Sequence, residues 1–384
     1  MATVTQTIGA VGRDFSTIGS WASQLDDTSV FASGDFAIGA CYADTDFEFA
    51  GTLEIDEGGT IELGGKQLTA AAGQRHDGTA DTGVRLLRTS GVDSEGVYFK
   101  SHTGNLGSQI DYIEIDNNET AVRSCLTNHG TYIGTQRCLV HGGRWSGANQ
   151  YTMGIAGGGE YSWLCNNFVW DTVLNQDTTS DAGTHLYGIR YGTSSRKINV
   201  ANTVYGTVSE SAVANRPCRG IYSAPSSYTC LWNCISMGTA YTGPSTAPSY
   251  LFDFHGMYME SGAIEAGGNM SSDDTAPGDW PGYVHRYHDQ VAADIFVSVT
   301  AGSVDLHLQS GTDAVGGGID IGEDTVITGY TYPGPPEDSY ALDIDGLDRV
   351  SEGLDWDCGA DQFVASASTA LPMAMNSYRQ MART

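Results

Sequence analysis

Basic side chains are scarce in this chain. Eighteen lysines and arginines stand against 46 aspartates and glutamates, which gives a formal net charge of -28 over 384 residues. A surface this acidic repels phosphate backbones, so we expect no nucleic-acid binding. No apolar run approaches the ~20 residues that a membrane-spanning helix needs, so we expect no membrane insertion. The opening stretch MATVTQTIGAVGRDF lacks the basic and apolar regions of a secretory signal, and we expect none.

Helical periodicity is also nearly absent, because no window keeps an apolar 3.6-residue period beyond a few turns. Fifty glycines and 20 tyrosines favour short strands joined by turns instead. The exception is DFSTIGSWASQL, in which Ile18, Trp21 and Leu25 share one helical face behind Ser16 or Asp14 as the N-cap. We predict a short N-terminal helix that closes one end of the fold.

The eight cysteines do not have the spacing of a metal site, and we expect buried free thiols. Cys230 and Cys234 should lie on one face of one strand, too far apart for a disulfide. Histidine gives no better metal pattern, since the nearest pair is His285 and His288 in VHRYHD. We expect no cofactor, with calcium in acidic turns as the open alternative.

Two sequence marks recur together about every 34 residues. The first is a glycine before an apolar residue, at Gly154, Gly188, Gly220 and Gly256. The second is an asparagine 13 or 14 residues later, and apolar residues alternate around it with the period of a strand. This period-two pattern predicts that the asparagine points inward. The four asparagines are Asn167, Asn202, Asn233 and Asn269.

Such a repeat, without helices, predicts an all-β fold: a right-handed parallel β-helix, or solenoid, with a short N-terminal capping helix and an irregular C-terminal closing region. Inward asparagines would then stack from coil to coil as a structural ladder that satisfies buried amides. Residues Ile155, Ile189, Ile221 and Met257 should form one apolar rung. We divide the chain into a cap and first coils at 1–95, regular coils at 96–278, closing coils at 279–363 and a tail at 364–384.

Several stretches resemble pectate-lyase-like right-handed β-helix repeat proteins of phage virions and bacterial surfaces. They are GRDFSTIGSWASQL, the segment AAAGQRHDGTADTGVRL that ends at Leu86, NMSSDDTAPG (Asn269 to Gly278), DLHLQSGTDAVGGGIDIG (Asp305 to Gly322) and WDCGADQF. At the last of these the chain departs from the usual ending through Cys358 and Gln362. The resemblance implies the architecture, whereas the same fold carries lyases, hydrolases, adhesins and structural coats.

The outward strand positions give a stripe of aromatic, arginine and histidine side chains. We predict these as a carbohydrate-binding site: Tyr187, Arg190, Arg219, Tyr222, His255 and Tyr258. The alternative is a plain exposed strand face. No stacked carboxylate pair accompanies the stripe, so we predict no catalytic residues, with Asp253 as a lone outward acid. Paired acids such as Asp343 with Asp345 fall in turns, where they favour turn formation or calcium binding.

The final segment LPMAMNSYRQMART changes character, because it contains no acidic residue. Adaptable methionines and a tyrosine with two arginines are typical of an interface. We predict that residues 372–384 anchor the chain to another virion protein or to further copies in a homotrimer, and a disordered end is the alternative. The anchor residues are Met373, Met375, Tyr378, Arg379, Met381 and Arg383.

Three functions fit these observations. The first is a virion structural protein, a capsid decoration, turret or tail-spike subunit that is assembled in the host cytoplasm, exposed on a phage particle and possibly in contact with host surface glycans. The second is a polysaccharide lyase or depolymerase on the same fold, and the third is an extracellular bacterial adhesin. The missing carboxylate pair disfavours the enzyme, and the missing export signal disfavours the adhesin.

Overall fold

A computed structural model defines the fold. It describes residues 2–59, 61–91, 94–102, 107–145, 151–175, 185–192, 197–211, 217–224, 229–243, 251–255, 264–277, 286–319, 321, 341–349 and 356–364. The predicted anchor at 372–384, and with it Tyr258 and His285, lies outside these residues. No helix in the described part of the chain is long and apolar enough to cross a membrane.

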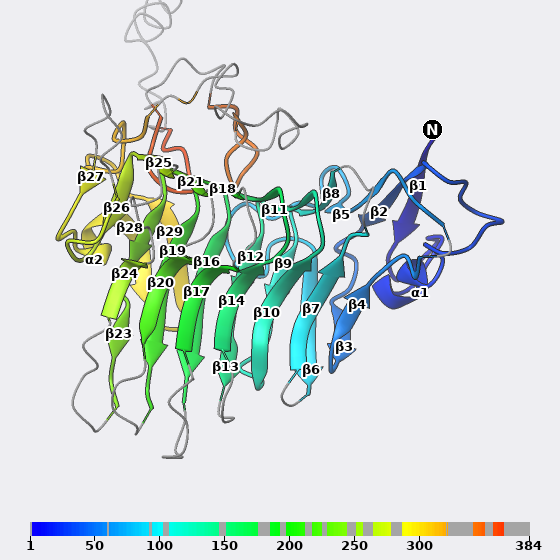
Figure 1. The fold of residues 1–384 in the computed structure, drawn as a ribbon, viewed down its shortest axis with the longest axis horizontal. Helices are drawn as coiled ribbons and strands as arrows, with labels where there is room; N and C mark the ends of the chain where they lie inside the picture. The colour runs from blue at the N-terminus through cyan, green and yellow to red at the C-terminus, as the bar shows by residue number, and fades with distance from the viewer. Residues whose placement is uncertain are drawn as a thin grey trace, which may run out of the picture.

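The chain winds as a parallel β-solenoid in which each turn contributes one strand to each of three sheets (Figure 1). This confirms the predicted all-β, parallel β-helix architecture. Sheet A consists of β1 (Thr3–Ile8), β2 (Phe36–Cys41), β5 (Gly65–Ala70), β8 (Ser108–Asp111), β11 (Ile133–Gln136), β15 (Ser162–Cys165), β18 (Lys197–Val200), β21 (Thr229–Trp232) and β25 (Ile264–Gly267).

The other two sheets repeat the same order. Sheet B consists of β3 (Phe47–Ala50), β6 (Arg85–Ser90), β9 (Glu114–Asp116), β12 (Leu139–His141), β16 (Phe168–Leu174), β19 (Thr203–Ser209), β22 (Ile235–Met237), β26 (Asn269–Ser271) and β27 (Arg286–Tyr287), with β13 (Gly143–Trp145) and β23 (Ala240–Tyr241) at its side. Sheet C consists of β4 (Leu53–Ile55), β7 (Ser94–Lys100), β10 (Val122–His129), β14 (Tyr151–Gly157), β17 (His185–Tyr191), β20 (Cys218–Ser223) and β24 (Leu251–His255).

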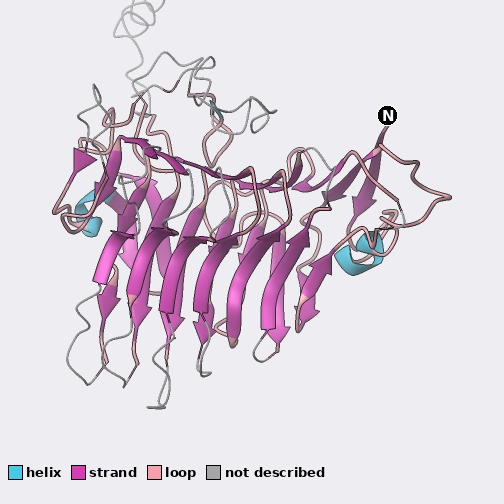
Figure 2. Cartoon of the chain, viewed as in Figure 1, coloured by secondary structure: helices cyan, strands magenta, loops and turns pink. Residues whose placement is uncertain are grey.

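Helices are few, as Figure 2 shows, and both are short. Helix α1 (Ile18–Ala22) buries Ile18, Trp21 and Leu25 in the main core, so the predicted helical face is correct. Its N-cap is Thr17, whose side chain accepts from the Ser20 amide, and the predicted caps Ser16 and Asp14 are wrong. Helix α2 (Ala292–Ile295) leads into the antiparallel hairpin of β28 (Phe296–Thr300) and β29 (Ser303–Leu308).

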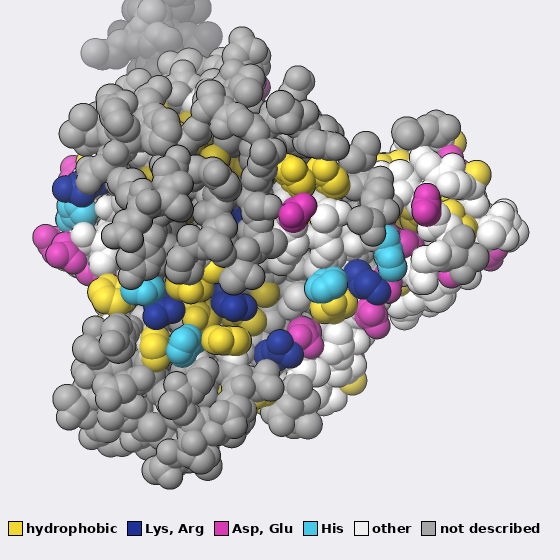
Figure 3. Space-filling view, viewed as in Figure 1, with side chains coloured by type: hydrophobic (Ala, Val, Ile, Leu, Met, Phe, Trp, Pro, Cys, Tyr) yellow, Lys and Arg dark blue, Asp and Glu magenta, His cyan; other side chains and the backbone are white. Residues whose placement is uncertain are grey.

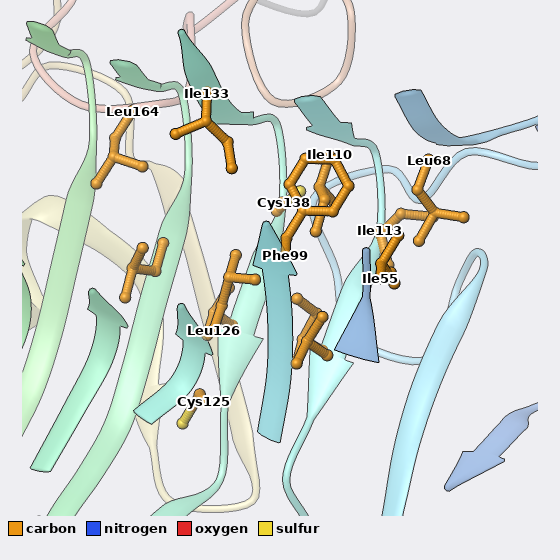
Figure 4. Close-up of a cluster of buried hydrophobic side chains, with 14 of the residues drawn as sticks. Ile55, Leu68, Phe99, Ile110, Ile113, Cys125, Leu126, Ile133, Cys138 and Leu164 are labelled. Carbon is orange, nitrogen blue, oxygen red and sulfur yellow. The ribbon is translucent and has the colours of Figure 1, made fainter. Parts of the chain in front are cut away.

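The core lies between the three sheets and is built from stacked apolar side chains (Figure 4). Ile155, Ile189 and Ile221 are fully buried and pair across β14, β17 and β20, as predicted. The next rung is Phe254, and the placement of Met257 there is wrong. The coil that ends in β24 has a loop of a different length before its strand, which displaces the register by three residues from the glycine pattern.

All eight cysteines are free and buried, as predicted. Burial raises the pKa of each thiol that it encloses, for example that of Cys125 and Cys234 to about 12. Cys230 belongs to an apolar cluster outside sheet A, whereas Cys234 belongs to the interior core. The prediction that both share one strand face is therefore wrong, because the chain turns a corner between them.

Each corner between sheets A and B is made by one residue in the left-handed conformation. Five corners carry φ values between 49° and 56° at non-glycine residues, and the last uses a glycine at 65°. Asparagine tolerates this conformation better than most residues. The corner residues in chain order are Tyr112, Arg137, Asn166, Ala201, Asn233 and Gly268.

The residue after each corner points inward, and there asparagine forms a ladder. Asn202 Oδ1 accepts from the backbone N–H and Nδ2 of Asn167, at 3.0 and 2.8 Å. Asn202 Nδ2 also donates to the Leu164 carbonyl at 2.7 Å. Asn269 repeats this pattern one amide higher, accepting from Cys234 N at 2.9 Å. Asparagine at this place therefore satisfies backbone groups of the preceding turn that no water can reach.

Asn233 is not part of this ladder, so that prediction is wrong. Cys234 occupies the inward position, and Asn233 is the corner residue before it. The Asn233 side chain instead points away from the interior and exchanges two hydrogen bonds of 2.8 Å with the backbone of Ile319. It thereby holds a closing segment against the outside of the solenoid.

Replacing Asn202 by leucine should lower the free energy of unfolding by about 3 kcal/mol, because the Asn167 amide and the Leu164 carbonyl lose their buried partners. Urea unfolding followed by far-UV circular dichroism measures this loss. Cys234→Asn places an amide at the equivalent position and should cost little. An Asn202→Leu variant as stable as the parent chain would show that the ladder is not stabilising.

The chain returns over the outside of sheets A and B after β27. Ile319, Ile321 and Trp356 cover an apolar cluster on sheet A that includes Trp163, Val200 and Trp232. Phe296, Leu306, Ile344 and Cys358 cover sheet B in the same way. The third sheet differs, because its outer face carries polar and aromatic side chains, and it is the face turned toward the viewer in Figure 1.

Candidate functional site

The outer face of sheet C gathers the side chains predicted to bind carbohydrate. Parallel pairing aligns Met153, Tyr187, Arg219 and Phe252 in one column and Ala156, Arg190, Tyr222 and His255 in the next. His255 was predicted in the first column, but the displaced register of β24 puts it beside Tyr222. Figure 3 shows arginine, histidine and apolar side chains grouped over β17, β20 and β24.

Rings and guanidinium groups alternate along these columns. Tyr187 and Tyr222 lie 4.9 Å apart between ring centroids, and Tyr222 stacks on His255 at 6.0 Å. Arg190 lies over the Tyr151 ring at 4.4 Å, and Arg219 lies over the Tyr222 ring at 4.8 Å. We call this set the sheet C stripe: Tyr151, His185, Tyr187, Arg190, Arg219, Tyr222, Phe252 and His255.

Burial divides the stripe into a support and a contact surface. Tyr187 and Arg219 are only 1% and 8% exposed, and the Tyr187 hydroxyl is bonded to His185 Nδ1 at 2.7 Å and to Arg219 at 3.2 Å. Burial raises the pKa of Tyr187 to about 12. Tyr151, Arg190, Tyr222 and His255 are half-buried and line the surface above them. A ligand would therefore meet these four side chains.

The electrostatics of the stripe are unusual for this acidic chain. Neither Arg190 nor Arg219 forms an ion pair with a described residue, and the buried Nε of each has no hydrogen-bond partner. Burial, and then the neighbouring Arg219, lower the pKa of His255 to about 4, so its ring is neutral at pH 7. The stripe therefore offers two guanidinium groups beside flat rings, an arrangement suited to hydroxyl or acidic groups on a sugar.

Sequence reasoning missed Tyr151, His185 and Phe252 as members of the stripe. Tyr151 and His185 begin β14 and β17, and they pair with one another in register. They stand three residues before Gly154 and Gly188, which is the sequence mark that could have identified them. Phe252 could not be found in this way, because β24 does not keep that spacing.

Asp253 is not an outward acid, and that prediction is wrong. It stands opposite Gly220 in the register and is only 1% exposed. Its carboxylate accepts from the Ser272 amide and hydroxyl at 2.7 and 2.6 Å. Burial, and then the nearby Asp273, raise its pKa to about 6. The side chain thus serves the corner between sheets rather than a surface site.

Three clusters among the described residues bring histidine and carboxylate atoms within 4.8 Å of one another: Asp56 with Glu57 and His102, Glu114 with Asp116 and His141, and His307 with Asp345 and Asp361. In the first, Lys100 Nζ binds Asp56 at 2.7 Å and Lys66 is paired with Glu57. In the second, Arg85 lies 3.8 Å from Asp116. The third has no such basic partner, and sequence reasoning noted Asp345 only as a turn residue.

Comparison of the chain with protein-family models gave no match, and comparison with curated proteins gave none either. The pectate-lyase-like family suggested by the sequence therefore remains a prediction, and the parallel β-solenoid itself rests on the geometry described above.

Proposed function

We propose that this protein is an exterior structural subunit of a phage particle, a capsid decoration or tail-spike type of subunit, which holds host surface glycans on the sheet C stripe. The observation that carries the glycan-binding part is the stripe itself. Rings and guanidinium groups from three consecutive turns form one continuous surface, and no carboxylate neutralises the two arginines.

The physical argument for sugar is that pyranose rings present flat C–H faces together with directional hydroxyl groups. An aromatic ring packs on the C–H face, and a guanidinium group donates to the hydroxyl or carboxyl oxygens. Tyr151 and Tyr222 supply the rings, and Arg190 stands between them over Tyr151. Tyr187 and Arg219 hold this layer from below, so the surface is ordered before a ligand arrives.

The particle location is supported by different features. A rigid parallel solenoid with a strongly acidic surface suits an exposed position, and the sequence resembles β-helix proteins that include phage virion components. Assembly as a homotrimer and attachment through residues 372–384 belong to the same proposal. Mass spectrometry of purified particles from an infected host, with antibody labelling of intact particles, tests this part directly.

Glycan binding should fall at least ~10-fold in Arg190→Ala and in Tyr222→Ala, because each removes a half-buried contact of the stripe worth roughly 1–2 kcal/mol. A glycan array identifies the ligand, and titration calorimetry measures the loss. The control is Tyr98→Ala, since Tyr98 stacks on His129 at 5.6 Å on the same sheet but outside the stripe.

Failure of the parent chain to bind any glycan would refute the glycan-binding part. Equal losses in the control variant would show that the stripe is not the site. The same glycans should be assayed for reducing ends and unsaturated uronates, because turnover would favour the enzyme in place of the structural subunit. Absence from purified particles would refute the virion part while leaving glycan binding to be explained by an adhesin.

A further inference from the structure

The third histidine–carboxylate cluster lies where three separate closing segments meet. His307 comes from β29, Asp345 from the turn at 343–346 and Asp361 from the last described stretch of the chain. One ligand atom from each lies within 4.8 Å of the other two. These residues, with Asp343, line a cleft of about 600 Å³ that opens to the surface. An ion from solution can therefore reach the cluster.

The cluster carries more negative charge than its neighbours balance. Asp305 binds His307 Nδ1 at 2.6 Å, and Asp345 lies 3.4 Å from Nε2 on the other side of the ring. No lysine or arginine forms an ion pair with Asp345 or Asp361 among the described residues. One imidazole thus faces three carboxylates: Asp305, Asp345 and Asp361.

Two buried polar groups at the cluster lack a hydrogen-bond partner. Asp361 is 5% exposed, and its single hydrogen bond, from the Leu308 amide at 2.8 Å, uses only Oδ2. Its other oxygen has no donor within the described residues. The Tyr112 hydroxyl is also buried and unpartnered, and it lies 2.8 Å from where a side chain at Gly346 would begin. Unmet oxygens of this kind are rare in folded proteins unless an ion or water completes them.

We propose that this cleft binds a divalent transition-metal ion, with Zn²⁺ or Mn²⁺ as the matching class, through His307, Asp345 and Asp361. An imidazole with two carboxylates is a ligand set for these ions, whereas calcium prefers oxygen ligands alone. Ligand atoms around Zn²⁺ lie ~3–3.5 Å apart, so the side chains would close by about 1 Å on binding. This proposal is independent of glycan binding by sheet C.

The site would join the hairpin of β28 and β29 to the two closing segments that follow it. The other two clusters lack this capacity, because Lys66, Lys100 and Arg85 already occupy the positions of a cation there. They therefore serve as internal controls on the same chain.

The test uses the full chain, freed of metal with EDTA and titrated separately with ZnCl₂, MnCl₂ and CaCl₂ by calorimetry. We expect saturable binding of one Zn²⁺ or Mn²⁺ ion per chain, with Ca²⁺ bound at least ~10-fold more weakly. Asp345→Asn should weaken binding at least ~10-fold, and because this side chain is 40% exposed the variant should still fold. His307→Gln should have the same effect.

The matched control is His141→Gln, which alters the cluster of Glu114 and Asp116 and should leave the affinity unchanged. Three results would overturn the proposal. The first is no saturable binding of Zn²⁺ or Mn²⁺, the second is unchanged affinity in both Asp345→Asn and His307→Gln, and the third is an equal loss in His141→Gln. Circular dichroism of each variant establishes that a loss of binding is not a loss of fold.

Discussion

Replacing Leu231 by aspartate should leave no stably folded chain at pH 7. Leu231 is fully buried in the interior core, where β21 places it between Asn199 and Ala266 of the neighbouring turns. Loss of the leucine contacts costs about 2–5 kcal/mol, and burial of a carboxylate adds several more. The sum is of the same order as the ~5–15 kcal/mol that holds a domain folded. Far-UV circular dichroism and urea unfolding measure the result.

A control variant separates lost packing from buried charge. Leu231→Asn also removes the leucine, but its uncharged amide can meet the buried Asn199 Nδ2, which has no partner in the parent chain. It should fold with a smaller loss of stability. Burial raises the pKa of an aspartate at position 231, so the folded state holds the proton more tightly than the unfolded state. Stability of Leu231→Asp should therefore rise, relative to the parent chain, as the pH falls from 7 to 4.

Equal stability of Leu231→Asp and Leu231→Asn at pH 7 would contradict this account, since the difference between them is the charge alone.

Arg349→Met should detach the closing segments and lower the free energy of unfolding by about 3–5 kcal/mol. Arg349 is fully buried, and it donates to Asn166 Oδ1 at 3.2 Å and to the Gly359 carbonyl at 2.9 Å. Its charge also offsets the buried carboxylates of Asp343 and Asp357, whose pKa values burial already raises. Without the guanidinium group these carboxylates remain in the protein with no cation beside them.

Hydrogen exchange locates the effect. Amides at 341–349 and 356–364 should lose protection in Arg349→Met, whereas those of β2 and β5, far along the solenoid, should keep theirs. The control is Arg123→Met, which breaks a surface ion pair with Glu95 at 3.5 Å and should cost less than ~1 kcal/mol. Unchanged protection of the closing residues in Arg349→Met would contradict the role given to this side chain.

The architecture could be predicted from sequence because a solenoid repeats its constraints. The apolar rung of Ile155, Ile189 and Ile221 appears three times at one spacing, and the sheet C strands pair as that spacing requires. The prediction failed where a loop changed length. Gly256 continued the sequence pattern, but Phe254 is the residue that pairs with Ile221. Loop length is free to vary because loops carry no ladder hydrogen bonds.

The asparagine at each corner shows a different limit. Two consecutive positions favour asparagine for unrelated reasons, the first for its left-handed backbone and the second for its inward amide. Asn166 and Asn167 occupy both. Asn202 occupies the second and Asn233 the first, so spacing that is uncertain by one residue cannot tell a ladder member from a corner residue.

The sites divide in the same way. Tyr187, Arg190, Arg219 and Tyr222 were found because strand periodicity alone places them on one face. The cluster of His307, Asp345 and Asp361 was not found, because its members come from segments up to 54 residues apart and follow no common period. Only the return of the chain over the solenoid brings them together.

That return also changes how the turns depend on one another. In an open solenoid each turn is coupled only to its neighbours, so unfolding can begin at an end and proceed turn by turn. Here residues 349–360 are bonded to four successive corners, at Asn166, Thr203, Asn233 and Gly268. Opening any one of these turns strains the contacts of the other three. The C-terminal half should therefore unfold as one cooperative block, and the turns before Asn166 should keep the graded, sequential melting of a one-dimensional array.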